Sequence, residues 1–297
     1  YFDLEKNLHS YEEVEGEFKK GTIKMAVVIP PQFGEDLKHV NKAQVQLIAD
    51  AADPNTANQL SNYATSVIMD YQNRITGNRQ LPYTINTEIR MLYNPQLKGA
   101  FNFVPGVMAM VLLLVCTMMT AITIVREKET GTMEILLVSP MKPMMIVIAK
   151  AIPYLLLSTF NIISILLLSV FVLEVPINGS LPLLLAISIL FILVSLSLGL
   201  LISNGAATQQ TAMFISLVAL FLPTIMLSGF MFPVENMPLP LRTVSNIVPA
   251  KWYYSMVKAV MIKGLGVGAI WKELLILNGM LVFFLGLAIK KFKIRLA

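Results

Sequence analysis

Long apolar runs dominate the chain from Phe101 onward. Each run is long enough for an α-helix to cross a bilayer, which takes ~20 residues. The second run is long enough to tilt or to extend beyond the membrane, and Pro153 and Pro223 interrupt two of the runs. The pattern predicts five membrane-spanning helices, over Val104–Val125, Met145–Leu173, Leu181–Ser203, Thr211–Met231 and Ile270–Lys290.

Residues 1–100 have a different pattern, polar and mixed in charge, in which short apolar stretches alternate with helical ones. Val45, Leu47 and Ala49 alternate with polar neighbours, as in a strand. Asp53 followed by Pro54 is typical of a helix start. Helices are expected at Tyr11–Lys20, Phe33–Val40 and from Asp53 to about Asn73, and strands at Lys24–Ile29, Gln44–Ala49 and Ile85–Tyr93, the first of them buried.

These patterns predict an α-helical polytopic membrane protein with a small α/β domain. The α/β domain would cover residues 1–100, and the transmembrane domain residues 101–297. In the helix that begins at Asp53, one apolar face is formed by Leu60, Ala64, Val67, Ile68 and Tyr71.

A charged segment, residues 126–143, separates the first two apolar runs. Charge this dense cannot lie in hydrocarbon without a large cost, so the segment is expected on a membrane surface. Gly131 predicts a helix end, and Thr132 can cap a new helix with Glu134 in its first turn. Met133, Leu136 and Leu137 would then share one face of a short amphipathic helix. Such a helix suits docking into another protein's groove, and a solvated loop is the alternative that the pattern leaves open.

Residues 232–268 are too polar to span a bilayer and too apolar for a free loop. Lys251 and Lys258 flank three aromatic residues, Trp252, Tyr253 and Tyr254. This combination predicts an interfacial helix with its rings at headgroup depth.

Composition supports a membrane protein, since the chain is 56% hydrophobic and 14% charged, with a mean hydropathy of +0.68. Its net charge of +5 is explained by lysine and arginine at membrane edges, and nucleic-acid binding is not expected. Cys116 is the single cysteine, and His9 and His39 lack partners at ligand spacing, so neither an intrachain disulfide nor a metal site is predicted. The sequence has no Walker-type phosphate-binding loop, so the chain is not expected to hydrolyse ATP by that route.

The stretch Arg-Glu-Lys-Glu-Thr-Gly-Thr-Met-Glu-Ile-Leu-Leu-Val-Ser-Pro, residues 126–140, resembles the cytoplasmic signature of ABC-2 type permeases. Residues 26–33 and 49–57 resemble the extracytoplasmic domain of the multidrug-efflux-like members, and residues 228–238 resemble the segment before their re-entrant helices. The resemblance implies a coupling helix that packs on a separate ATPase subunit. Its contacts would be Arg126, Glu127, Lys128, Glu129, Gly131, Thr132, Met133, Glu134, Leu136 and Leu137. It also implies an external gate formed by Ser228, Gly229, Pro233, Pro238, Pro249, Trp252 and Tyr253.

The same resemblance implies a permease subunit of an ATP-driven exporter in a bacterial plasma (inner) membrane. The partners would be an ABC ATPase subunit, which binds ATP and Mg, and a second permease subunit, with a periplasmic adaptor as a further candidate. The positive charges near the helix ends conflict, and the resemblance settles the orientation: residues 126–143 and 290–297 cytoplasmic, residues 1–100 outside. An external first domain requires a preceding helix, so a sixth, N-terminal span is expected before Tyr1.

Two other functions fit the sequence less well. One is a membrane-anchored structural or sensory component of an envelope complex that transports nothing. The other is a secondary transporter. The spans contain almost no acidic residues to carry protons or sodium, which argues against this function. The substrate, and whether the permease pairs with itself or with a different subunit, stay open.

Overall fold

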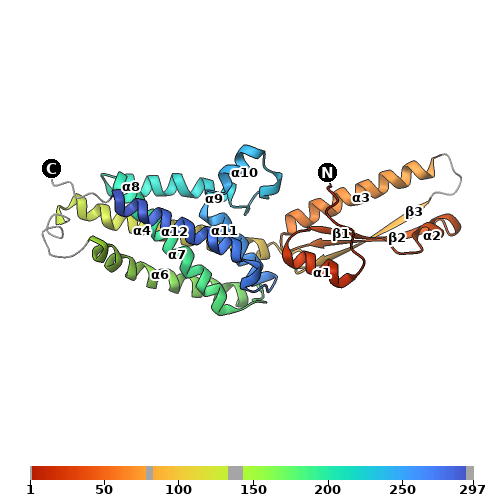
Figure 1. Cartoon of the computed structure of the whole chain (residues 1–297), viewed down its shortest axis with the longest axis horizontal. Coiled ribbons are helices and arrows are strands. Elements are labelled where there is room, and N and C mark those ends of the chain that lie inside the picture. Colours follow the sequence, from red (N-terminus) through yellow and green to blue (C-terminus); the bar gives the residue numbers. More distant parts are fainter. Residues whose placement is uncertain (1, 78–82, 133–142, 292–297) are drawn as a thin grey trace. The chain divides into compact units, whose positions relative to one another are not determined.

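The computed structural model describes the backbone of residues 2–77, 83–132 and 143–291. The chain divides into two compact units, Tyr1–Asn102 and Phe103–Ala297. The first contains a sheet flanked by helices, and the second is helical (Figure 1). The division falls close to the predicted boundary after residue 100.

The first unit contains, in its described residues, three strands in the order β1-β2-β3, with β2 antiparallel to β1 and parallel to β3. The helix α3 connects the two parallel strands and packs Ala64 and Ile68 against Val45 and Leu47 of β2. The six elements predicted here are confirmed, with ends that differ by no more than three residues. Their bounds are α1 (Tyr11–Lys20), β1 (Met25–Val28), α2 (Phe33–His39), β2 (Lys42–Asp50), α3 (Pro54–Thr76) and β3 (Thr84–Leu92).

The ends of the helices in this unit are set by local chemistry. Asp53 caps α3, because its side chain accepts hydrogen bonds from the amides of Asn55 and Thr56, as predicted. Ser10 caps α1 in the same way, and Gly21 ends it in the left-handed conformation at φ 71°.

Two expectations about burial in this unit need correction. The first strand was expected to be buried, but β1 lies at the edge of the sheet and its Val27 is 53% exposed. The apolar face of α3 was expected to include Val67 and Tyr71, which are 56% and 50% exposed. The core stripe of α3 is rotated toward Ala57 and Ala64, which pack on the sheet, so Val67 and Tyr71 lie at its margin.

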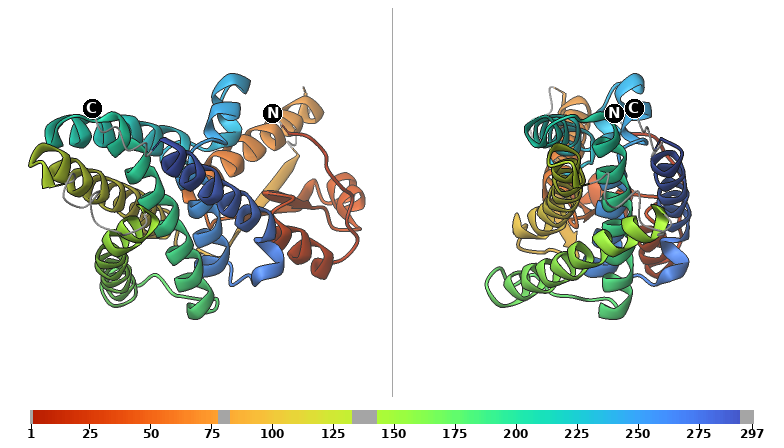
Figure 2. Two further views of the ribbon diagram at one scale, coloured as in Figure 1. Left: turned by 60° about the vertical axis from the view of Figure 1, so that its left-hand side comes forward. Right: turned by 90° about the vertical axis from the view of Figure 1, so that its left-hand side faces the viewer.

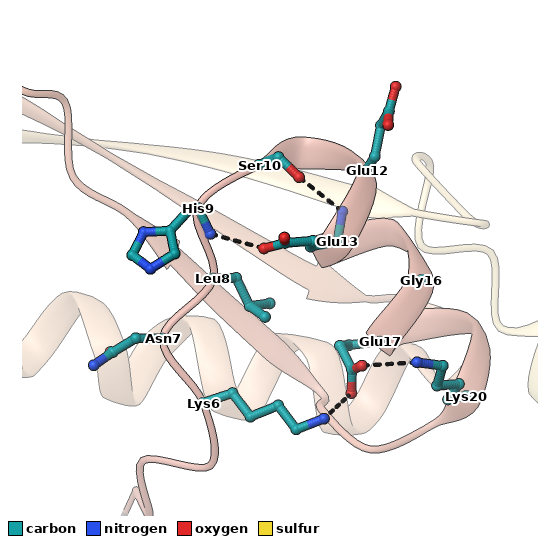
Figure 3. Close-up of a pocket in the computed structure, with 10 residues that line it drawn as sticks. All are labelled: Lys6, Asn7, Leu8, His9, Ser10, Glu12, Glu13, Gly16, Glu17 and Lys20. Atoms are coloured by element: carbon teal, nitrogen blue, oxygen red, sulfur yellow. Dashed lines mark hydrogen bonds and ion pairs between the residues drawn. The ribbon is translucent and has the colours of Figure 1, made fainter.

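Residues 2–10 precede α1 as an extended segment, which we call the strap. Lys6 of the strap forms an ion pair of 3.0 Å with Glu17 of α1, and Lys20 pairs with the other oxygen of the same carboxylate (Figure 3). The hydroxyl of Thr22 also donates to Glu17, at 2.6 Å. A cavity of about 680 Å³ lies between the strap and α1. The carboxylate of Glu17 therefore ties the strap to the folded unit.

In the part of the chain that the structure describes, five helices are long and apolar enough to cross a membrane, as predicted. The fourth is not a continuous α-helix: α8 leads into a π-helical turn and then α9, which ends four residues before the predicted Met231. Pro223 lies in the first turn of α9, directly after the π-helical turn. The spans are formed by α4 (Ala100–Glu129), α6 (Pro143–Phe171), α7 (Leu181–Gly205), α8 (Gln209–Ser216) with η1 (Leu217–Phe221) and α9 (Leu222–Leu227), and α12 (Trp271–Lys291).

The helix α7 lies at the centre of the second unit (Figure 2). Of its most apolar stretch, 61% is buried, against 11–22% for α6, α8–α9 and α12. It approaches α4 so closely at Gly199 that an added Cβ would lie 2.6 Å from the carbonyl oxygen of Thr117. Nearby, Ile124 of α4, Leu200 of α7 and Ala288 of α12 form one buried cluster. The small residue at position 199 lets these backbones pack directly, as is common between membrane helices.

The ion pairs of Glu17 predict that the strap is held in a pH-dependent way. Hydrogen bonds from Thr22, Lys20 and Lys6 lower the pKa of Glu17 from 4.5 to about 2. Because the folded-state pKa lies below the unfolded value, the stabilisation is complete above about pH 4.5 and is lost as the pH falls toward 2. Amide hydrogen exchange of residues 2–10, corrected for its intrinsic pH dependence, should accelerate through this window. Glu17→Gln should accelerate it already at neutral pH.

Glu15→Gln is the matched control. Glu15 pairs with Lys19 on the exposed side of α1, away from the strap, so its loss should leave exchange of the strap unchanged. Identical exchange in Glu17→Gln and the wild type would contradict the role given to this carboxylate.

Candidate functional site

The charged segment begins inside α4. The first spanning helix was expected to end at Val125, but α4 continues to Glu129, so Arg126 to Glu129 form its last turn. Gly131, the predicted helix terminator, follows two residues after Glu129 with a left-handed φ of 72°. The amide of Thr130 still donates to the carbonyl of Arg126 at 3.0 Å, and that of Gly131 to Lys128 at 3.3 Å.

Lys128 turns from this last turn toward the end of α7. Its ammonium group donates a hydrogen bond to the backbone carbonyl oxygen of Ser203. Ser203 belongs to the last turn of α7, where carbonyl groups lack helical partners and the helix dipole is negative. The lysine therefore supplies both a donor and a matching charge to the carboxyl end of α7.

Glu129, the next residue, contacts the start of α8. One carboxylate oxygen accepts a hydrogen bond of 2.9 Å from the backbone amide of Gln209, and the other accepts one from the Gln209 side chain. Thr208 caps the same helix end by accepting from the amide of Thr211 at 3.2 Å. An acidic side chain is favoured there because the amino end of a helix carries a partial positive charge.

We call these two interactions, Lys128 with Ser203 and Glu129 with Gln209, the Lys128–Glu129 contact. Two adjacent residues of α4 hold the two helix ends on either side of one short turn, each with the charge that this end favours. Beneath the contact, a buried apolar cluster joins α4 to the same turn: Ala121, Val125, Ala206 and Ala212. The end of α4 and the α7–α8 turn thus form one packed unit.

The remaining residues of the expected coupling site fall into two groups. Arg126 is exposed, Glu127 is half-buried, and the hydroxyl of Thr132 contacts the hydroxyl of Thr130 at 3.0 Å and the Glu127 carbonyl at 3.4 Å. Met133, Glu134, Leu136 and Leu137 lie in residues 133–142, outside the described residues, so the short amphipathic helix stays a prediction.

The contact of α4 with the polar turn at residues 204–210 was not expected from the sequence. Ser203, Thr208 and Gln209 were therefore missed as members of the site. A signal for them exists in the sequence, because Thr208 and Thr211 have the spacing of a helix cap.

Residues 232–268, where the external gate was expected, form short helices. Gly229 precedes them with a φ of 87°, and the Ser228 hydroxyl accepts from the amide of Phe230 at 3.2 Å. Pro233, Pro238 and Pro249 stand at or next to the first residues of three of these helices, where proline fits. The elements are η2 (Val234–Asn236), α10 (Leu239–Ser245), α11 (Pro249–Val257), η3 (Lys258–Ile262) and η4 (Val267–Ala269).

The aromatic residues of α11 do not all behave as expected. Tyr253 and Tyr254 were predicted to lie at headgroup depth, but both side chains are buried inside the protein. Tyr253 stacks on Phe191 of α7 at 4.2 Å between ring centres, and its hydroxyl contacts that of Ser188 at 2.8 Å. The polar end of the ring is satisfied by a second hydroxyl, which makes burial possible. Trp252 remains half-buried and donates to the Asn246 carbonyl at 3.0 Å.

Lys251 of α11 connects the short helices to one another. Its ammonium group donates to the Ser245 hydroxyl at 3.0 Å and to the Asn246 side chain at 2.6 Å, both at the end of α10. Burial lowers the pKa of Lys251, and the charge of Arg242 acts in the same direction.

Among the described residues, no group of three or more His, Cys, Asp or Glu side chains could hold a metal ion.

Comparison with known proteins gives the family. A family model described as "ABC-2 family transporter protein" matches residues 1–290. The chain belongs to the ABC-2 transporter family. This confirms the resemblance seen in the charged segment and makes the chain a multi-pass membrane permease, in agreement with its spanning helices.

Three relatives of this ABC-2 permease come from Escherichia coli (strain K12). The chain is 34% identical over 288 residues to the "Probable multidrug ABC transporter permease YbhS", covering 96% of this chain and 76% of the relative. It is 32% identical over 250 residues to the "Probable multidrug ABC transporter permease YbhR", covering 84% and 68%. It is 28% identical over 288 residues to the "Inner membrane transport permease YhhJ", covering 95% and 76%.

The Lys128–Glu129 contact predicts the effect of a charge reversal in this ABC-2 permease. Glu129→Lys places a cation at the positive end of α8 and removes two hydrogen bonds. We expect faster amide exchange at residues 204–211 and a thermal midpoint lower by about 2–4 °C in detergent. Thr130→Lys places the same cation one residue further on, outside the contact, and should leave both readouts near the wild-type values. Equal behaviour of the two variants would contradict the assignment.

Proposed function

We propose that this chain is the permease subunit of an ATP-driven exporter. In this proposal residues 126–143 dock on a separate ATPase subunit, and the spanning helices form the substrate path. The observation that carries the proposal is the Lys128–Glu129 contact, which ties the charged segment to the α7–α8 turn. A solvated loop would not require hydrogen bonds that fix its first residues to two other helices.

The partners follow from the family and from the sequence. The chain lacks a Walker-type phosphate-binding loop, so ATP and Mg would be bound by the ATPase polypeptide and not by this chain. ABC-2 permeases generally work in pairs, and a second permease subunit would complete the substrate path. The relatives' names include "multidrug", which supports drugs as the substrate class. A periplasmic adaptor stays a further candidate partner, on the family resemblance alone.

The orientation belongs to the same proposal. Docking on an ATPase requires residues 126–143 in the cytoplasm, and residues 290–297 share that side because four spans separate the two sites. Residues 1–100 would then lie outside the membrane. A relative is named an "Inner membrane transport permease", which supports the bacterial inner membrane as the location.

The proposed mechanism uses two kinds of helix. Closure of the ATPase would displace the charged segment, and the Lys128–Glu129 contact would pass this displacement to α7 and α8 together. The buried α7 would transmit it as a stiff element, whereas the π-helical turn before Pro223 would let α8 and α9 bend. A two-state rearrangement of this kind is what nucleotide binding can bias.

The coupling role predicts that two classes of variant separate. Gly131→Val and Glu134→Lys should weaken co-purification of the ATPase, since both change the docking segment. Glu129→Gln should weaken association less than these two variants do, and should lower the transport obtained per ATP hydrolysed in proteoliposomes by roughly 2- to 30-fold. The Glu129 carboxylate is engaged by Gln209 within this chain, so its neutral replacement first weakens the hold on the α7–α8 turn.

Gly131→Asn is the control for Gly131→Val. An added Cβ at Gly131 meets no atom within 4 Å, so the cost of valine comes from the left-handed backbone, which asparagine tolerates. Normal ATPase association and normal coupling in Gly131→Val, Glu134→Lys and Glu129→Gln would overturn the exporter proposal. That result would favour a component that does not transport.

The proposed orientation predicts the accessibility of single cysteines. Asn58 and Thr130 are both exposed, and the native thiol of Cys116 is buried. In intact cells, Asn58→Cys should react with a membrane-impermeant maleimide and Thr130→Cys should react only after the membrane is permeabilised. The reverse pattern would overturn the orientation together with the docking role.

A further inference from the structure

The first unit contains a second, larger cavity that is also lined by the strap. Its volume is about 890 Å³, within the range of small-molecule sites. It is lined by the strap, the start of α1, β1 with residues on either side of it, Leu47 of β2, and α3. Its apolar lining includes Phe2, Leu4, Val27, Ile29, Leu60 and Val67.

The cavity arises because α3 does not cover the edge of the sheet. Val27 of β1 pairs with Leu47 of β2, so the two side chains point to the same face. Leu47 is fully buried under α3, whereas Val27 is 53% exposed. Across the gap, Val67 of α3 is 56% exposed, because the core stripe of the helix is rotated away from it. Two apolar walls therefore face an incompletely filled space.

The strap lies along this space and adds apolar side chains to its lining. Phe2 and Leu4 line the cavity from the strap and remain 45% and 82% exposed, so the cavity is open to solvent along the strap. The ion pair between Lys6 and Glu17 holds the strap to α1. Grouped apolar side chains on a polar domain mark binding sites more often than scattered ones do.

The charges around the cavity indicate what kind of molecule fits it. Asp3 and Glu5 contribute two negative charges to the lining, and Lys6 and Lys24 contribute two positive charges. The lining therefore selects for neither anions nor cations, and affinity must come from apolar area.

We propose that this cavity binds an uncharged, lipophilic small molecule. The site lies within the first unit and does not depend on ATPase docking, so it stands apart from the coupling role.

The test is photolabelling of the full chain in lipid nanodiscs with a trifluoromethyl-phenyl diazirine, an uncharged lipophile. After trypsin digestion, mass spectrometry should find label in residues 25–38, which carry Val27 and Ile29. A large excess of the same compound without its diazirine should suppress the label in residues 25–38. Labelling of the spanning helices serves as the internal reference for probe delivery.

Val67→Asp and Val40→Asp form the matched pair. Both replace an exposed valine in the first unit by aspartate, but Val40 is 65% exposed after α2 and does not line the cavity. Val67→Asp should lower the label in residues 25–38 about fivefold or more, although the substitution lies in another peptide, since an unpaired charge is costly in apolar surroundings. Val40→Asp should leave the label unchanged.

Two results would overturn the proposal. One is that the wild type carries no label in residues 25–38 that the excess compound suppresses. That result would favour a protein partner for this surface. The other is an equal loss of label from residues 25–38 in Val67→Asp and Val40→Asp. Co-purification of the ATPase, measured on the same preparations, shows separately whether the coupling proposal holds.

Discussion

The match between side-chain charges and helix ends at the α7–α8 turn is the interaction on which the proposed function depends. Lys128 meets the carboxyl end of α7, and Glu129 meets the amino end of α8. Each charge is stabilised by the dipole of the helix end it contacts. Because the two residues are adjacent in α4, a displacement of its last turn would act on both helix ends at once. The charged segment is thereby attached to the centre of the helical unit.

The packing beneath this contact suits the transmission of a displacement. Gly199 allows α4 and α7 to approach at van der Waals distance, and small residues such as Ala121 and Ala206 fill the space near the turn. The helix α7 is the most buried of the spanning helices described, whereas α8 and α9 are joined through a π-helical turn and are largely exposed. A stiff element and a bendable element thus start from the same turn.

Sequence reasoning succeeded where a local signal decides the structure. The five spans, the cap at Asp53 and the helix end at Gly131 depend on short patterns and are confirmed. It failed where a distant partner decides. Tyr253 is buried because Ser188, 65 residues earlier, satisfies its hydroxyl, and a tyrosine at a membrane surface has the same local pattern. Likewise, the contact of Glu129 with Gln209 spans 80 residues, and the structure of residues 133–142 stays a prediction.

The central claim is that the end of α4 and the α7–α8 turn move as one body during transport. The most direct test is a disulfide across the contact, made by Glu129→Cys with Gln209→Cys in a Cys116→Ala background and assayed with the ATPase in proteoliposomes. If the claim is right, oxidation does not lower ATP-driven transport, and it restores part of the coupling that the reduced protein loses with the native contact. Transport that stops on oxidation and returns on reduction would show that the contact must open in each cycle, and would contradict the claim.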